Sequence, residues 1–414
     1  MSTRRVAMTG IGVVSPIGVG RAAFFKALRE GRSGVARISR FDCSTFAVQL
    51  AGEVRQPLDL PEEVARVAAE DPKVGFAYAA CREALEQAGV TRLDDKALLH
   101  LGASLEIFDL AKAVHHGRPD FHALVEQSFA DGARPLQIPL DTAARLICRS
   151  WGQPWRALTN CSACAAGAQA IGHGFRAVRA GQIEVAVCGG FDSMINPLGV
   201  GGFQMLGALT ADNQRGAHAC RPFDAERAGT VLGEGAAVLV LEPLEMAHAA
   251  GKTVLAEVCG YGSSLDAYNL SAPDPDGDGA LRAMRAALAD ADLTPDAIEH
   301  ISAHGTGTRL NDEVEAAAIR RLFSASWTRI PVSAIKSVMG HLIAAAGAVQ
   351  AAGCLLPLRE GVLPPNLSLD KVGSGCELCH VTSPGSPFSG EYVLSNSFGF
   401  GGQNASLVFR RSAG

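Results

Sequence analysis

Two cysteines stand in the segment ALTNCSACAAGAQAIGHGF, where small residues lead into an alanine-rich run that predicts a helix reaching to about Ala180. The free N–H groups and partial positive charge at the start of a helix can lower a thiol pKa from about 8.5 to between about 3.5 and 7.5. Cys161 or Cys164 is therefore a candidate nucleophile that would react as a thiolate. The alternative is that Cys164, like Cys188 or Cys259, fills an apolar core.

Two histidines lie where polar turns meet apolar segments. His304 is in HISAHGTGTRLNDEVEAAA, after an expected strand and before a helix expected to begin near Asn311. Ligands of α/β proteins usually bind at such strand ends. His341 is in SAIKSVMGHLIAAAGAVQAAG, five residues after Lys336. Considered alone, His304 is more simply a locally hydrogen-bonded loop residue, and Lys336 an ordinary surface lysine.

Other chemistry-bearing patterns are weaker. Cys161 and Cys164 lie too far along the chain from a second CxxC pair, Cys376 and Cys379, for a zinc-ribbon site. The second pair, in CELCH, matches the c-type haem attachment pattern, but that chemistry requires export, which nothing in the sequence indicates. In the opening TGIGVVSPIG, Ser15 stands where a dinucleotide-binding motif has its third glycine. We therefore expect neither a metal site nor a dinucleotide site.

Strand-like and helix-like segments alternate along the chain, which indicates α/β layers. Gly-rich turns followed by strands occur twice, as LGEGAAVLVLEP at 232–243 and FGFGGQNASLVFRR at 398–411. A second internal echo is expected between the opening strand with Gly10 and Gly12 and the strand HISA with Gly305 and Gly307. These echoes suggest two similar halves that meet near residue 250. Strands are expected at 6–9, 185–188, 238–241, 298–302 and 392–395.

The composition is that of a compact α/β protein. Of 414 residues, 48% are hydrophobic and 46 are glycine, which suits many tight strand-to-helix turns. The net charge of -5, without a run of lysines or arginines, argues against nucleic-acid binding. No apolar stretch reaches the roughly 18 residues of a membrane span, and the N-terminus has no secretory signal pattern. With 11 cysteines in mostly apolar contexts, we expect a cytoplasmic protein with reduced thiols.

The nucleophile segment, HGTGT, KSxxGH and NSFGFGG follow one another in this order. Here the sequence resembles the elongating β-ketoacyl-acyl-carrier-protein synthases of fatty-acid and polyketide synthesis. The resemblance spans nearly the whole chain, through TGIGVVSPIG, NPLGVGGF and RPFDAERAGTVLGEGAAVLVLE. It implies a thiolase fold, with two similar α/β halves in a layered αβαβα arrangement. The nucleophilic cysteine would belong to residues 1–250, and the catalytic histidines and lysine to residues 251–414.

The family pattern implies a role for each candidate residue. Cys164, three residues before Gly167, corresponds to the family's nucleophile, so the role falls to it rather than to Cys161. The other implied assignments are His304 and His341 as catalytic histidines, Lys336 as the active-site lysine, Thr306 and Thr308 as contacts of the pantetheine arm, and Phe400 as a gate whose backbone N–H forms an oxyanion hole with that of Cys164.

The resemblance also implies a reaction. An acyl group on Cys164 would condense with malonyl-acyl-carrier protein, with loss of carbon dioxide, to give a β-ketoacyl-acyl-carrier protein. Both substrates are carried on the phosphopantetheine of acyl carrier protein, so no metal or other cofactor is expected. The family further implies a homodimer, or a heterodimer with a ketosynthase-like partner.

The sequence departs from the family pattern in three places. Gln350 stands where the family has a glutamate that pairs with the lysine, so Lys336 is expected to be held differently. Segment 102–139, which in the family helps shape the acyl pocket and the dimer contact, differs strongly. In the region 61–73, where relatives often carry basic residues that dock the carrier protein, only Arg66 and Lys73 are basic.

These departures favour a specialised polyketide ketosynthase over a housekeeping fatty-acid enzyme, although the two share their chemistry. A non-catalytic partner such as a chain-length factor would lack the cysteine, which is present here as Cys164. A degradative thiolase would carry a second catalytic cysteine in the C-terminal half, and NSFGFGGQN has none. The sequence leaves open the acyl chain length, the pathway and the oligomer.

Overall fold

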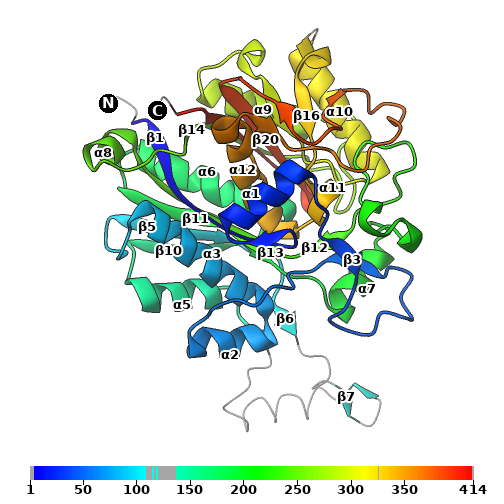
Figure 1. Ribbon diagram of the computed structural model, residues 1–414, viewed down its shortest axis with the longest axis horizontal. Helices are drawn as coiled ribbons and strands as arrows, with labels where there is room; N and C mark the ends of the chain where they lie inside the picture. Colours follow the sequence, from blue (N-terminus) through cyan, green and yellow to red (C-terminus); the bar gives the residue numbers. More distant parts are fainter. Residues whose placement is uncertain (1–3, 109–113, 116–117, 120–136, 325, 413–414) are drawn as a thin grey trace.

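The computed structural model describes residues 4–108, 114–115, 118–119, 137–324 and 326–412. Most of the divergent segment 102–139 therefore lies outside the described residues, and the expectations attached to that segment stay predictions. Four of the five strands expected from the sequence lie within longer observed strands, and the fifth, 298–302, overlaps a strand at His300–Ser302. Strands and helices alternate along the chain (Figure 1). The α/β class is confirmed.

Among the described residues, one large mixed sheet has 12 strands. Its path runs β10-β5-β11-β13-β1 and continues through β14-β21-β20-β15-β16-β18, while β2 pairs with the end of β1. In sheet order the bounds are β10 Arg156–Asn160, β5 Ala97–Gly102, β11 Val185–Asp192, β13 Gly235–Pro243, β1 Val6–Ser15, β14 Ala256–Leu265, β21 Gln403–Arg410, β20 Tyr392–Gly399, β15 His300–Ser302, β16 Pro331–Ser333 and β18 Cys379–His380, with β2 at Gly18–Val19.

The strand order is mirrored about the contact between β1 and β14, which pair antiparallel. β13 and β21 occupy equivalent places beside these two strands, as the echo between 232–243 and 398–411 predicts. The other expected echo is wrong: Gly305 and Gly307 follow β15, whose mirror position is held by β5, and the counterpart of β1 is β14. That residues 1–250 and 251–414 are two related halves remains a proposal, which the mirrored order supports.

Five layers follow from the way helices cover the two parts of the sheet. Helices α6 (Ala166–Arg179) and α12 (Ala346–Gly353) share one apolar core with strands from both parts, including β13 and β21. On one outer side, α3 (Pro72–Ala88) and α5 (Thr142–Trp151) pack on β5, β11 and β13. On the other outer side, α9 (Asp278–Asp290) and α10 (Arg309–Phe323) pack on β20 and β21. The arrangement is the expected αβαβα, with α6 and α12 central in Figure 1.

The remaining elements surround these layers. The further helices are α1 Arg21–Glu30, α2 Glu62–Glu70, α7 Pro197–Met205, α8 Leu244–Ala249 and α11 Lys336–Met339, with short turns η2 Ala163–Ala165, η3 Asn213–His218, η4 Pro295–Ala297, η5 Ser326–Thr328, η6 Ile343–Ala345, η7 Leu356–Glu360 and η8 Phe400–Gly402. Small sheets comprise β12 Leu232–Gly233, β4 Leu50–Gly52 and β3 Val35–Arg37; β17 Val362–Leu363 and β19 Ser386–Pro387; β6 Ile107–Phe108 and β9 Gln137–Ile138; β7 Val114–His115 and β8 Arg118–Pro119.

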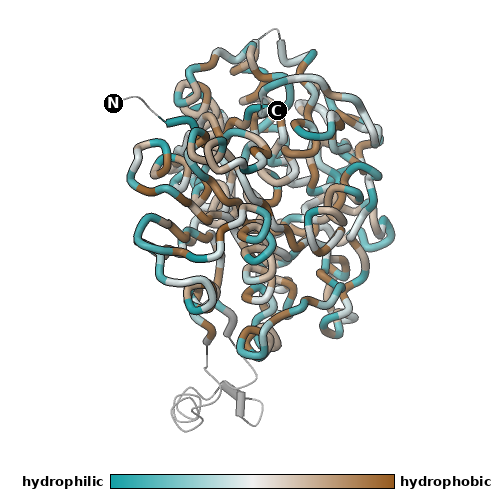
Figure 2. The backbone as a smooth tube through the Cα atoms, turned by 60° about the vertical axis from the view of Figure 1, so that its left-hand side comes forward, coloured by the Kyte–Doolittle hydropathy of each residue, from teal (hydrophilic) through white to brown (hydrophobic). Residues whose placement is uncertain are grey.

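Burial follows the layers. Every residue of β13 is buried, because helices cover both of its faces, and its sequence GAAVLVLEP accordingly reads as a nearly continuous apolar run. In Figure 2 the hydrophilic parts of the chain gather in turns at the outline of the molecule. None of the helices in the described part of the chain combines the length and apolar character that a membrane crossing demands.

Close approach between strand and helix depends on glycine at matching places in the two parts of the sheet. A Cβ atom at Gly12 in β1 would lie 1.9 Å from the carbonyl oxygen of Ala80 in α3. A Cβ atom at Gly262 in β14 would lie 2.2 Å from the carbonyl oxygen of Ala283 in α9. Because backbone atoms cannot move aside as a flexible side chain can, each outer helix sits at a distance that only glycine allows.

The substitution Gly12→Ala should lower the free energy of unfolding by roughly 1–3 kcal/mol, since it forces α3 away from β1. Urea denaturation measures this change. The matched control is Gly201→Ala in α7, where the new Cβ would meet only Phe46, at 3.6 Å. That helical alanine should leave stability unchanged or raise it by up to about 1 kcal/mol. Equal effects of the two substitutions would show that the close approach at Gly12 is not a structural constraint.

Candidate active site

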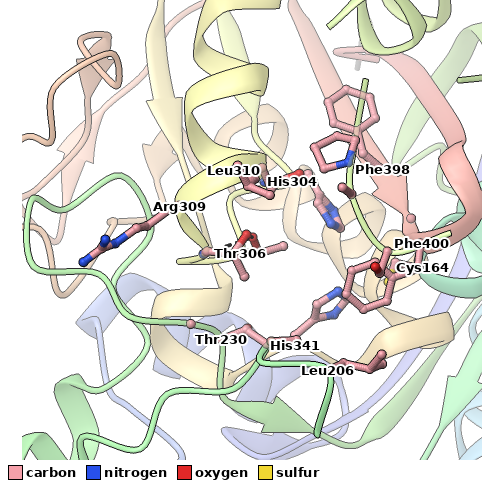
Figure 3. A pocket seen from close by; sticks show the side chains of 18 of the residues that line it. Cys164, Leu206, Thr230, His304, Thr306, Arg309, Leu310, His341, Phe398 and Phe400 are labelled. Atoms are coloured by element: carbon pink, nitrogen blue, oxygen red, sulfur yellow. Dashed lines mark hydrogen bonds between the residues drawn. The ribbon is translucent and has the colours of Figure 1, made fainter. Parts of the chain in front are cut away.

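A cavity of about 400 Å³ is lined by segments that follow β14, β15 and β20 and by the turn before α6 (Figure 3). Cys164, His304 and His341 line it together, and the Sγ atom and one ring nitrogen of each histidine all lie within 4.8 Å of one another. Thr306 and Thr308 line the same cavity, as does Phe400. The structure thus brings together residues that are far apart in the sequence.

Cys164 lies in the turn η2, which directly precedes the central helix α6. The turn begins with Ala163 in a left-handed conformation, at φ 47°. β20 ends against this turn: a Cβ atom at Gly399 would be 3.0 Å from the Cys164 backbone nitrogen. As a result, the backbone N–H groups of Phe400 and Cys164 both stabilise negative charge on the sulfur.

The protonation state of Cys164 differs from the sequence-based expectation of a thiolate. Burial raises the pKa of the Cys164 thiol to about 11, and the Lys336 ammonium group and the two backbone N–H groups only partly oppose this effect. The thiol is therefore the stable form of the resting site near pH 7. The position before a helix is as predicted, but the cost of desolvating a buried thiolate exceeds the benefit of the helix start.

Cys161, the competing candidate, is exposed and is not among the residues that line the cavity. Its thiol donates a hydrogen bond to the carbonyl oxygen of Ser104, at 2.6 Å. Of the two cysteines in the segment, the structure places Cys164 beside the histidines. This placement agrees with the assignment of the nucleophile to Cys164.

His341 is held in a fixed orientation by the backbone that follows it. Its Nδ1 atom accepts a hydrogen bond from the backbone N–H of Ile343, at 3.0 Å. Nδ1 is therefore unprotonated, and the ring proton sits on Nε2. Burial, together with the nearby charge of Lys336, holds the pKa of His341 well below 6.5. The side chain is a neutral N–H donor at pH 7.

Lys336 determines the same tautomer for His304. The Lys336 Nζ atom lies 3.2 Å from His304 Nδ1, and it also donates to the His304 carbonyl oxygen at 2.5 Å. Because an ammonium group can only donate, Nδ1 accepts and the proton lies on Nε2. Burial, Lys336 and His341 hold the pKa of His304 well below 6.5. Burial also lowers the pKa of Lys336 to about 8, so the ammonium form prevails at neutral pH.

A cysteine and two histidines at this spacing also suggest a zinc site, but their surroundings do not fit one. A histidine that binds metal through Nε2 carries a proton on Nδ1 and donates it to an acceptor. Here both Nδ1 atoms face donors, the Ile343 N–H and the Lys336 ammonium group. Metal binding through Nε2 would put a proton on each Nδ1, where it would face the N–H of Ile343 or of Lys336 with no acceptor between them. The expectation that the site is not a metal centre is therefore supported by the chemistry of its hydrogen bonds.

Gln350 holds Lys336 by hydrogen bonds of its side-chain amide. Its Oε1 atom accepts from Lys336 Nζ at 2.6 Å. Its Nε2 atom donates to the carbonyl oxygens of Ala303, at 3.0 Å, and Asn396, at 2.9 Å. These two carbonyls determine which end of the amide faces Lys336. The lysine is thus held by a neutral group, and a glutamate here would place an oxygen against the two carbonyl oxygens.

Two acidic residues that the sequence analysis missed hold the His304 loop in place. Glu315 on α10 accepts from the backbone N–H groups of His304 and Gly305, at 2.8 Å each. Asp312, one turn earlier, accepts from the backbone N–H of Thr306 at 3.0 Å. Burial raises the pKa of Glu315 to about 7. Two acids three residues apart, on the helix that follows HGTGT, are the signal that could have identified them.

Asp192 is a third such residue, at the end of β11. It accepts from the hydroxyl of Ser104, at 2.8 Å, and from the backbone N–H groups of Ser193 and Ala344, at 2.9 Å each. Ala344 follows His341 by three residues, so Asp192 ties the histidine turn to the N-terminal strands. Burial raises the pKa of Asp192 to about 6. An isolated FDS segment in the sequence carries no signal of this role.

The expected threonines and basic residues have mixed outcomes. The hydroxyls of Thr306 and Thr308 lie 2.8 Å apart at the cavity wall. Lys73 is not available to dock a partner: it is buried and forms an ion pair with Asp71 at 2.5 Å. The helix α3 begins at this pair, with Asp71 as its N-cap. Arg66 is exposed on α2 and remains a candidate docking residue.

The sequence and the fold are both similar to those of known proteins. Residues 3–247 match the family described as beta-ketoacyl synthase, N-terminal domain, and residues 255–370 match beta-ketoacyl synthase, C-terminal domain. The chain is 35% identical over 418 residues to the 3-oxoacyl-[acyl-carrier-protein] synthase 2 of Coxiella burnetii, with 99% of each sequence covered. Two solved structures are also similar, each over 99% of this chain and 100% of the other: the ishigamide ketosynthase/chain length factor (TM-score 0.85, 34% identity), and a type II polyketide acyl-carrier protein in complex with its ketosynthase (TM-score 0.86, 28% identity).

The substitution Gln350→Glu tests the way Lys336 is held. A carboxylate there would offset the Lys336 charge that stabilises the Cys164 thiolate, so the pKa of Cys164 should rise and alkylation by iodoacetamide should slow, by about tenfold for each unit of pKa. Loss of the two amide N–H bonds should also lower stability by roughly 1–3 kcal/mol. Both are measured in a Cys161→Ala background, and peptide mass spectrometry separates labelling of Cys164 from labelling of the partly exposed Cys259 and Cys379.

Gln182→Glu is the matched control, since Gln182 is exposed in the turn after α6 and the substitution adds the same charge away from the cavity. It should leave the pH profile of alkylation unchanged. Faster labelling of the Gln350→Glu protein than of its parent at a given pH would contradict the account of this site.

Proposed function

This chain belongs to the beta-ketoacyl synthase family, and we propose that it condenses an acyl group held on Cys164 with malonyl-acyl-carrier protein, releasing carbon dioxide. The product is a β-ketoacyl-acyl-carrier protein, two carbons longer, in fatty-acid or type II polyketide synthesis. One observation carries the proposal: a buried thiol and two imidazole N–H donors meet at the end of one cavity.

In the first step, an acyl group moves from the carrier-protein thioester to Cys164. The sulfur attacks the thioester carbonyl, the bond to the pantetheine sulfur breaks, and the proton of the Cys164 thiol ends on the released pantetheine thiol. The backbone N–H groups of Cys164 and Phe400, which face the sulfur, are placed to stabilise the tetrahedral oxyanion. Each such donor is worth roughly 3 kcal/mol.

In the second step, a malonyl thioester enters and its carboxylate leaves as carbon dioxide. The electron pair of the broken carbon–carbon bond forms an enolate, whose oxygen carries the negative charge. The Nε2–H groups of His304 and His341 are the donors for this oxygen. Because burial keeps both rings neutral, each ring is a single-proton donor at pH 7.

In the third step, the enolate carbon attacks the acyl-Cys164 carbonyl. The tetrahedral intermediate collapses with release of the sulfur, which takes up one proton and restores the thiol. The balance is one acyl group and one malonyl group consumed, with one carbon dioxide and one β-ketoacyl group formed. The same backbone N–H groups serve both acyl-transfer steps.

Each charge that develops in this sequence meets a group of the chain itself, so the proposal needs no metal or redox cofactor. The acyl groups arrive on acyl carrier protein, as the names of the relatives indicate. Thr306 and Thr308 are proposed to contact the pantetheine arm, and Phe400, whose ring stacks near Phe203 at 6.3 Å between centroids, to gate the acyl pocket. We place the reaction in the cytoplasm, because all 11 cysteines are free thiols, as is usual in a reducing compartment.

A second ketosynthase-like chain is proposed to pair with the open edge of β10. This strand ends the sheet, and its neighbourhood exposes Trp155 and Leu158. An exposed apolar edge is unfavourable in an isolated chain. Pairing with a second chain, in a homodimer or a heterodimer, would cover this edge. A purely non-catalytic partner role is disfavoured, because Cys164, His304 and His341 are brought together intact.

Three variants separate the two half-reactions. Cys164→Ala should still release carbon dioxide from malonyl carrier protein but form no β-ketoacyl product, because decarboxylation needs only the enolate donors. His304→Ala and His341→Ala should each lose decarboxylation by roughly 100-fold or more, since one donor cannot replace two at a charged oxygen. Carbon dioxide release and product mass are measured in parallel, after circular dichroism confirms folding.

Cys161→Ala is the control and should retain both activities, because Cys161 does not line the cavity. Wild-type decarboxylation by both histidine variants would show that the histidines are not the enolate donors. An acyl adduct on Cys161 would overturn the assignment of the nucleophile.

A further inference from the structure

Arg309 lies at the end of the cavity away from the catalytic residues. It is the first residue of α10, its side chain is exposed, and it lines the cavity wall. Figure 3 shows Arg309 and Cys164 on opposite sides of the labelled group, with Thr306 between them. The Arg309 side chain extends away from the thiol. Its guanidinium group therefore marks the mouth of the cavity.

No ion pair or hydrogen bond involves the Arg309 guanidinium group in the part of the chain that the structure describes. Two other arginines, in contrast, form ion pairs. Arg221 pairs with Asp224 at 2.9 Å, and Arg227 pairs with Glu313 at 2.7 Å. A cation at the first position of a helix is also unfavourable, because the helix N-terminus is itself partly positive. Arg309 thus contributes no visible interaction to the stability of the fold.

The proposed substrate supplies the missing anion. The thioester end of the phosphopantetheine arm must reach Cys164, and the arm's amides then pass the threonines at the cavity wall. The only charged group of the arm is its phosphodiester, at the other end, which must lie near the mouth. Arginine matches phosphate oxygens with parallel N–H donors, which suits it to this anion better than a point charge would.

We propose that Arg309 binds the phosphate of the phosphopantetheine arm and so anchors the carrier-bound acyl group at the cavity mouth. This inference rests on the proposed function, because it takes the carrier-bound thioester as the substrate. It assigns a binding role to the residue directly after the pantetheine-contact segment HGTGT. Arg309 acts on binding and has no part in the chemical steps.

The test compares Cys164 acylation by one acyl group on four carriers: acyl carrier protein, phosphopantetheine, pantetheine and N-acetylcysteamine. Intact-protein mass spectrometry follows the rate against donor concentration. Arg309→Ala should raise KM about tenfold for the two donors that carry the phosphate, with the limiting acylation rate unchanged. It should leave acylation by the two donors without phosphate unaffected. Arg309→Lys should show a smaller rise in KM, because lysine keeps the charge but not the fork of donors.

Arg285→Ala is the matched control. Arg285 is an exposed arginine on α9, it does not line the cavity, and the structure shows no ion pair for it. It should behave as the wild-type protein with all four donors.

Three results would overturn the inference. An equal rise in KM with all four donors would make Arg309 a structural residue. A rise in KM with acyl carrier protein alone would mean that Arg309 meets a carboxylate on the carrier surface. An unchanged KM with every donor would exclude a binding role. If the wild-type protein accepts an acyl group from none of the four, the proposed function fails instead, and the two failures are distinguishable.

Discussion

The buried Lys336 ammonium group donates hydrogen bonds to three acceptors. They are His304 Nδ1, the His304 carbonyl oxygen and Gln350 Oε1. No carboxylate lies within ion-pair distance of it among the described residues. The buried charge is stabilised by this complete set of hydrogen bonds and by the more distant Glu315 carboxylate. The lysine thereby determines the tautomer of the His304 ring and leaves a positive charge close to the Cys164 thiol.

The fold positions these groups through two turns at the starts of the central helices. Cys164 lies in the turn before α6, and His341 just before the turn that begins α12. Each turn contains a residue with positive φ, Ala163 at 47° and Ile343 at 45°. The helices approach so closely at Gly167 that a Cβ atom there would lie 2.9 Å from the Ala344 carbonyl oxygen. The glycine thus allows the segments that carry the thiol and the His341 imidazole to pack closely.

The ordered motifs of the sequence predicted the αβαβα fold and singled out Cys164, His304 and His341, which meet in the cavity, and Lys336, which contacts His304. They could not predict what holds those residues, because Glu315 and Asp192 act through backbone N–H groups that the fold alone brings within reach. Burial also reversed one expectation drawn from residue type, because the Cys164 thiol is held protonated despite its place before a helix. Lys73, one of only two basic residues in 61–73, forms an interior ion pair, which the sequence alone does not indicate.

His304 and His341 are both neutral Nε2–H donors, whose tautomers are determined by Lys336 and by the Ile343 N–H respectively. Long-range ¹H–¹⁵N correlation spectra of protein labelled with ¹⁵N-histidine, assigned with the single His304→Ala and His341→Ala variants, observe this directly. We expect an Nε2-protonated, Nδ1-unprotonated ring for both residues throughout pH 6 to 7, where Lys336 stays an ammonium group. An Nδ1-protonated tautomer, or an imidazolium ion, at either position within that range would contradict it.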